Sequence, residues 1–151
     1  MSGIERIEHE GVVLAIILRD GPTAPGIHFH TPADYSQQLA CMRHPAGHVI
    51  PPHIHNPVPR AVRYTQEALF LRRGRLRIDF YDKDRTYVES RVIGPGDVIL
   101  LISGGHGFEV LEEIEMVEVK QGPYAGEMDK TTFSGVSAAV ARIVKGTGQE
   151  S

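Results

Sequence analysis

The sequence predicts an all-β barrel or sandwich, and three observations support this class. Between Glu10 and Lys120 the chain consists of short runs rich in Val, Ile, Leu, Phe and Tyr. Gly, Pro and Asp separate these runs, which show little helical periodicity. The segment 75–81 alternates strictly between polar and apolar residues, as a strand does when one face meets a core. We therefore expect antiparallel strands that enclose one core.

The expected strands are taken in chain order. They cover residues 12–19, 27–29, 37–43, 68–73, 75–81, 87–93, 98–101, 107–111 and 114–120. Turns are expected at Gly74, at 82–84 and at 94–97, because Gly, Pro and Asp favour turn geometry. In segment 75–81, alternation places Leu76, Ile78 and Phe80 on a core face, and it places Arg75, Arg77 and Asp79 on a face that we expect to meet water.

Length and composition predict one domain. A chain of 151 residues with 41% hydrophobic residues is sufficient for one core. We expect the barrel to occupy residues 1–133. The weakly helical run 136–144 and the polar residues around it predict a short helix or a flexible tail over 134–151.

Charge and cysteine content narrow the function classes. The 16 Lys+Arg and 19 Asp+Glu give a formal net charge of -3, which disfavours a nucleic-acid partner. Cys41 is the only cysteine, so an intrachain disulfide or Cys-rich zinc site is excluded. The apolar runs 12–18 and 98–102 are too short to span a bilayer, and the first residues are acidic, unlike a signal peptide. We expect a cytoplasmic protein without a membrane partner.

A metal site is predicted from four residues. His53 and His55 are separated by one residue, so on an extended segment both imidazoles point to the same side. Glu67 begins an apolar strand, and a carboxylate on the interior face would need a cation to offset its burial. His106 follows a turn and an apolar strand, from which it can supply a third imidazole. Three nitrogens and one carboxylate suit a single divalent Fe, Mn, Ni, Zn, Co or Cu ion, and the sequence does not choose among them.

The arrangement of these residues resembles the two motifs of the cupin family. The resemblance covers Gly47 to about Val110: Gly47 precedes the His-x-His pair, Glu67 is followed by Gly74, and Gly94-Pro-Gly-Asp97 precedes His106. It implies a double-stranded β-helix, or jelly-roll barrel, with His53, His55, Glu67 and His106 as metal ligands. It also implies a homodimer that pairs through barrel edge strands, for which segment 12–18 is our candidate.

Two departures from the cupin pattern concern the geometry of the site. Eleven residues, 56–66, separate His55 from Glu67, where the family usually has a much shorter link, which implies a lengthened hairpin loop at the mouth of the site. In the second motif Ile102 replaces a common Pro, His106 comes about one residue early, and Val110 lies near the place of a frequent Asn.

Further residues are candidates for substrate contacts. Arg60 and Arg63 lie in the long loop, where no acid neutralises them, and with Tyr64 they are candidates for binding an anionic substrate; a solvated loop is the alternative. Lys120 is a candidate for orienting substrate, or for proton transfer if burial lowers its pKa, and Tyr124 is a candidate cover of the pocket. A second pair, His28 and His30, is a weaker alternative for metal binding.

Three functions remain open at the level of sequence. The first is a metal-dependent enzyme, of isomerase or epimerase type, acting on a small anionic, oxygen-rich molecule such as a sugar or keto acid. The chain also resembles small single-domain bacterial cupins, some of which are linked with carbohydrate metabolism. The second is a non-haem Fe(II) dioxygenase. The third is a non-catalytic module that binds a metabolite.

Overall fold

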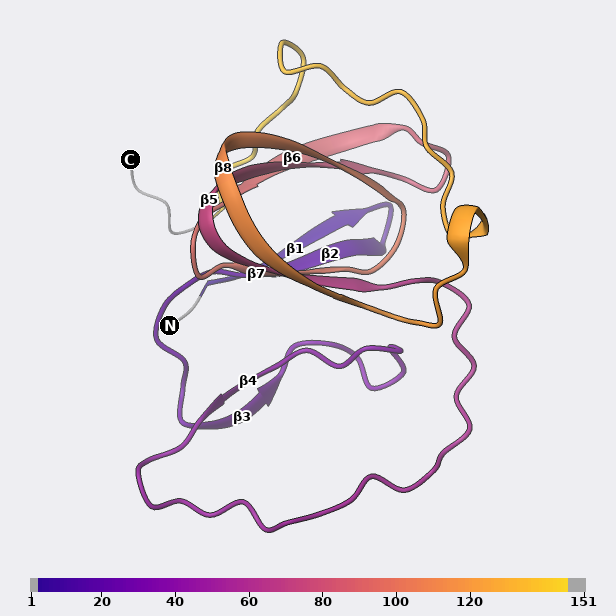
Figure 1. The fold of residues 1–151 in the computed structure, drawn as a ribbon. Helices are drawn as coiled ribbons and strands as arrows, with labels where there is room; N and C mark the ends of the chain where they lie inside the picture. The colour runs from indigo at the N-terminus through magenta and orange to yellow at the C-terminus, as the bar shows by residue number, and fades with distance from the viewer. Residues whose placement is uncertain (1–2, 147–151) are drawn as a thin grey trace.

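The computed structural model describes residues 3–146 and contains eight strands (Figure 1). They are β1 (Ile4–His9), β2 (Val12–Leu18), β3 (Gly26–Phe29), β4 (Ala40–Arg43), β5 (Glu67–Tyr81), β6 (Tyr87–Ile93), β7 (Val98–Leu101) and β8 (Gly105–Lys120). A single 3-10 turn, η1 (Gly126–Met128), follows β8. The predicted all-β class is confirmed. No helix in the described part of the chain is long and apolar enough to cross a membrane.

Six strands form one antiparallel sheet that curls into a half-barrel (Figure 1). The order is β1-β2-β7-β5-β6, and β8 pairs with β5. Strand β5 is central: β7 pairs with its first residues and β6 with its last, whereas β8 follows it from Glu67 to Tyr81. The strands β3 and β4 form a separate two-stranded ribbon. Because β2 is paired with both β1 and β7, segment 12–18 cannot be the free edge that we expected to form a dimer.

Alternation along the strands divides the apolar residues between the two faces of the sheet. The face inside the curl carries the larger core, which includes Leu69, Leu71, Leu76, Ile78 and Phe80 of β5, each at most 2% exposed. The other face carries a smaller cluster. It consists of Ile16, Leu18, Ala68, Leu100 and Ile102, against which Tyr35, Leu39 and Cys41 pack. Near the start of β5, apolar side chains therefore pack on both faces of the sheet.

Gly74 was expected in a turn, but it lies within β5, which joins the two strands predicted on either side of it. Its φ of +83° coincides with register shifts against β8, which bend the long strand. A Cβ at this position would lie 2.0 Å from the carbonyl oxygen of Glu113. Glycine is thus required for the close approach of the β8 backbone, and the bend lets β5 follow the curl of the sheet.

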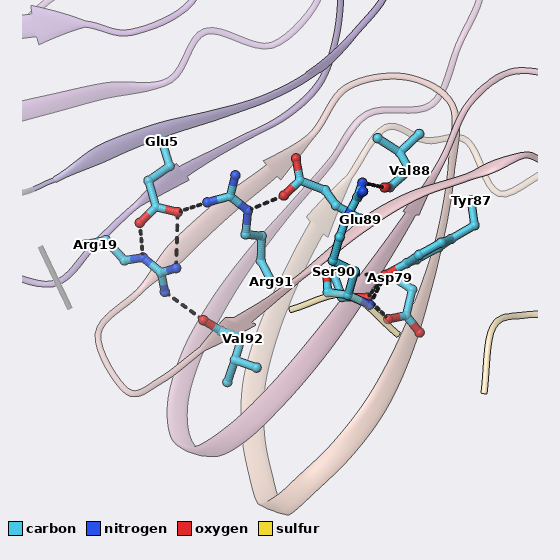
Figure 2. A network of polar contacts seen from close by, with 10 residues as sticks. Glu5, Arg19, Asp79, Tyr87, Val88, Glu89, Ser90, Arg91 and Val92 are labelled. Carbon is cyan, nitrogen blue, oxygen red and sulfur yellow. Dashed lines mark hydrogen bonds and ion pairs between the residues drawn. The ribbon is translucent and has the colours of Figure 1, made fainter. Parts of the chain in front are cut away.

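The expectation that Arg77 and Asp79 meet water is wrong, since they are only 4% and 5% exposed. Arg77 donates two hydrogen bonds to the Asp79 carboxylate. The Ser90 hydroxyl donates to the same carboxylate (Figure 2). The alternation is correct, but a later segment reaches the side chains on this face: the amide of Arg142 donates to the Tyr87 hydroxyl, which is hydrogen-bonded to Ser90 Oγ. The amide of Ser90 donates to the carbonyl of Arg142, and the amide of Val144 donates to that of Ser90. A polar side chain whose hydrogen bonds are satisfied is compatible with burial.

The segment at the C-terminus forms one turn rather than a helix. The amides of Val140 and Ala141 both donate to the carbonyl of Ser137, and no further helical turn follows within the described residues. Ile143 then forms a parallel bridge with Ser90 of β6. The rest of the expected helix or tail, 147–151, lies outside the described residues. The segment therefore pairs with the edge of β6 that β5 leaves open.

A second polar network joins the N-terminal strands to the turn before β7. Figure 2 shows its part around Glu5, Arg19 and Arg91. Arg19 donates to both oxygens of Glu5 at 2.7 and 3.2 Å and to Asp97 Oδ2 at 2.8 Å. Arg91 also donates to Glu5, at 2.9 Å. Asp97 accepts the backbone amides of Asp20 and Gly94 as well. The Gly-Pro-Gly-Asp turn is thus fixed by its aspartate, which is 6% exposed.

Candidate functional site

The curl of the sheet brings two of the predicted ligands into contact. Glu67 begins β5 and His106 lies at the start of β8, so the two residues stand at opposite ends of the β5–β8 ladder. Nevertheless His106 Nε2 lies 3.3 Å from Glu67 Oε2. Glu67 shares its face with Leu69 and Leu71, which belong to the core inside the half-barrel. The contact is therefore made across the interior of the curled sheet.

The Glu67 carboxylate is partly removed from water, since its side chain is 18% exposed and that of His106 is 30% exposed. The hydrogen bond with His106 lowers the pKa of Glu67, and burial opposes this effect. The charges of Lys120 and Lys130 lower it further. The pair presents a carboxylate oxygen and an imidazole nitrogen at one point, which are two donors of the kind that bind transition metals.

Lys120 lies next to this pair. Its Cα is the antiparallel partner of the Glu67 Cα, so their side chains extend on the same face with Cβ atoms about 5 Å apart. Its Nζ lies 3.3 Å from Glu118 Oε1, and this hydrogen bond raises the pKa of Lys120. The burial that would make Lys120 a proton acceptor is not found. A protonated Lys120 is instead suited to bind an anionic group.

The structure does not bring His53 and His55 to Glu67 and His106. Both lie in the segment 45–65, in which every residue is exposed. Their rings contact each other edge to face, with centroids 5.3 Å apart, and His53 Nδ1 is 3.0 Å from the carbonyl oxygen of Pro51. Among residues 3–146 no three His, Cys, Asp or Glu side chains are grouped closely enough to hold a metal ion.

The lengthened hairpin that we expected around the His pair is not formed. Strand β4 ends at Arg43 and β5 begins at Glu67, and residues 44–66 contain no strand (Figure 1). Five prolines, at 45, 51, 52, 57 and 59, remove backbone donors from this segment, which disfavours strand pairing. The His-x-His pair is therefore on an irregular excursion rather than on a barrel strand.

Two of the predicted substrate-binding residues line a groove on the other face of the sheet. Arg63 and Tyr64 form one wall of this groove, whose volume is about 500 Å³. Gln66 and Ile102 also line it, and Ile102 belongs to the smaller apolar cluster. Arg60 is exposed on the same loop but does not line the groove. The interior pair and the groove therefore lie on opposite faces near the start of β5.

The remaining candidate residues, Tyr124, His28 and His30, belong neither to the Glu67–His106 pair nor to the groove. Tyr124 is 84% exposed in the turn after β8 and does not line the groove. On β3 the His28 ring bonds to the carbonyl of Pro25 at 2.9 Å, whereas His30 Nε2 is buried without a partner among the described residues. Sequence reasoning missed Asp34, Tyr35 and Ser36, which line the groove. No sequence motif links these residues to Arg63 and Tyr64, which follow almost thirty residues later.

The described residues thus present an acid–imidazole pair inside the half-barrel and a groove outside it. Either place can bind a small ligand, because each combines an apolar surround with a few polar side chains. Comparison with known proteins adds no name to these sites: the chain matches no family, no curated protein and no solved structure.

Proposed function

We propose that this protein binds one divalent transition metal ion through Glu67, His106, His53 and His55, and that it is a metal-dependent enzyme. The substrate class is a small, anionic, oxygen-rich molecule such as a sugar or keto acid, and the reaction is an isomerisation or epimerisation. The observation that carries the proposal is the 3.3 Å contact between Glu67 and His106 inside the half-barrel. The resemblance of the four residues to the cupin motifs supports it.

The donor chemistry fits a transition metal. Glu67 supplies a carboxylate oxygen among apolar neighbours, where an attached cation would offset the cost of burying charge. The Nε2 atom of His106 faces the same carboxylate and is a nitrogen donor when the ring is neutral. The interior pair would form one half of the ligand set, and the His-x-His pair would form the other half.

The segment 45–65 has the length and the composition to supply this second half. Twelve residues from His55 to Glu67 can extend over about 40 Å, so the chain length does not prevent a contact. The segment exposes several large apolar side chains that do not line the groove, among them Val49 at 75%, Ile54 at 86% and Val58 at 56%. Folding of residues 45–59 over the half-barrel would bury part of that apolar surface and leave the groove residues 61–64 in place, and metal binding is a common cause of such ordering.

The residues of the chain would have distinct roles in catalysis. A bound metal ion supplies Lewis acidity toward an oxygen of the substrate. Lys120, held protonated by Glu118, binds the anionic group of the substrate beside Glu67. The core residues Leu69 and Leu71 form an apolar wall, which reduces access of water to the reacting groups.

The test is the metal content of the natively purified protein, measured by elemental analysis. We expect about one equivalent of a transition metal per chain, and loss of most of it in Glu67→Gln, in His106→Ala and in the double variant His53→Ala/His55→Ala. Glu118→Gln is the matched control for the first of these. The double variant is decisive, because both residues are exposed and their removal leaves the core intact.

His48→Ala is the control for the double variant, since His48 is exposed on the same excursion outside the motif. If the double variant retains the wild-type metal content, or if the protein binds none of the six candidate metals, the proposal fails. Iron in the purified protein, together with oxygen consumption, would favour the dioxygenase hypothesis over the isomerase hypothesis. Binding of a sugar or keto acid that is unchanged after chelation would leave a non-catalytic module.

A further inference from the structure

The groove on the outer face is built on a framework of glutamine side chains. Gln66 is 8% exposed, and two of its oxygens accept hydrogen bonds from Gln37. The side-chain oxygen of Gln66 accepts the backbone amide of Gln37, and its backbone carbonyl accepts the Gln37 side-chain amide at 2.8 Å. Gln121 accepts the Gln66 amide at 2.7 Å and donates to the Ser36 hydroxyl at 2.8 Å. These bonds attach the turn that carries Asp34, Tyr35 and Ser36 to the start of β5. One wall of the groove is thereby fixed to the sheet.

The floor of the groove is apolar and belongs to the sheet itself. Val13 and Ile102 line it, and both are part of the smaller apolar cluster. The amide of Ile102 donates to the carbonyl of Leu14, and the Ser103 hydroxyl donates to the carbonyl of Val13. The polar groups of the floor are consequently occupied, so a ligand would meet a hydrocarbon surface there.

The polar side chains at the rim are available to a ligand. Arg63 and Asp34 both line the groove, and neither forms an ion pair in the part of the chain that the structure describes. Tyr64 is 75% exposed beside Arg63, and the half-buried Tyr35 also lines the groove. A cation, an acceptor and two aromatic rings thus border one apolar floor.

We propose that this groove binds a small hydroxylated aromatic carboxylate, at a site separate from the predicted metal site. The Arg63 guanidinium is the partner for the carboxylate, because its planar donors match two carboxylate oxygens. The ligand ring covers Val13 and Ile102 and contacts Tyr35 or Tyr64. The Asp34 carboxylate accepts the hydroxyl of the ligand. Its charge also selects against a second acidic group in the ligand.

The site is independent of the proposed metal centre, because the groove and the Glu67–His106 pair lie on opposite faces of the sheet. Binding of 4-hydroxybenzoate, benzoate and phenol to the full chain is measured by calorimetry and by NMR shift perturbation. The measurement is repeated after chelation and in Glu67→Gln. We expect 4-hydroxybenzoate to bind most tightly, with the same affinity in all three preparations. Failure of the metal proposal would leave this result unchanged.

Three variants assign the roles of the rim residues. Arg63→Leu should weaken 4-hydroxybenzoate by roughly tenfold or more and leave phenol unchanged, since only the first carries a carboxylate. Asp34→Asn should reduce the preference for 4-hydroxybenzoate over benzoate. Arg60→Leu is the matched control, because it removes the same charge from the same loop outside the groove and should change nothing.

The inference is overturned if 4-hydroxybenzoate does not bind at about 10 mM, a concentration at which even weak specific sites are occupied. It is also overturned if Arg60→Leu weakens binding as much as Arg63→Leu does, which would indicate attraction by net charge alone. Loss of binding on chelation or in folded Glu67→Gln protein would assign the ligand to the interior site instead.

Discussion

Removal of the Asp97 carboxylate should destabilise the protein strongly. In Asp97→Ala the backbone amides of Asp20 and Gly94 lose their acceptor, and each such loss costs about 1–1.5 kcal/mol. Arg19 loses a charge-assisted bond worth about 1.5–3 kcal/mol but retains Glu5. The expected loss in the free energy of unfolding is about 3.5–6 kcal/mol, which is a large part of the stability of a typical domain.

The assay is urea unfolding followed by far-UV circular dichroism, since the chain contains no Trp. With an m-value of about 2 kcal/mol/M, the unfolding midpoint should fall by about 2–3 M. Asp97→Asn keeps one oxygen acceptor and should lose less. Asp84→Ala, in an exposed turn, should lie within about 0.5 kcal/mol of wild type. A loss below about 1 kcal/mol in Asp97→Ala would refute the proposed role of the network.

Three further variants test the fold. Gly74→Ala should lower the free energy of unfolding by more than about 1 kcal/mol in urea titrations, because its Cβ would lie 2.0 Å from the Glu113 carbonyl at a φ of +83°; an unchanged midpoint would contradict the bend in β5. Phe80→Ala should cost about 3–5 kcal/mol in the same assay, since Phe80 is 1% exposed, and a cost below about 1 kcal/mol would place it outside the core. The Thr86 amide donates to Asp82 and lowers its pKa. The stability from this bond is therefore present at neutral pH and lost as the pH falls through the ordinary aspartate range toward the lowered pKa. Asp82→Asn should remove this part of the acid dependence, measured as the urea midpoint between neutral pH and about pH 3; a curve parallel to wild type would count against it.

The local sequence pattern was sufficient to predict the fold class and to predict which residues of β5 face the core. Alternation assigned Leu76, Ile78 and Phe80 to the core, where all three are at most 1% exposed. It also assigned Glu67 to the face of Leu69 and Leu71. These assignments succeed because side-chain direction along a strand repeats every two residues, whatever the strand packs against.

The same pattern could not say what covers the second face of a strand. Arg77 and Asp79 alternate with the core residues as water-facing residues do, yet they are buried together with Ser90. Ser90 is hydrogen-bonded to Tyr87, and the Tyr87 hydroxyl accepts the amide of Arg142, more than fifty positions later in the chain. Whether a polar pair is buried depends on residues far away in the sequence, and the local alternation of a strand carries no information about them.

The sequence by itself determined an all-β chain, its core residues and the residue types that can bind a metal. Only the tertiary structure decided that Glu67 meets His106, that His53 and His55 lie on a strand-free excursion, and that Arg63 lines a groove on the other face. The physical reason is distance along the chain. Strand direction is set between neighbouring residues, whereas the curl that joins the ends of the β5–β8 ladder accumulates over the twist and bulges of the whole sheet.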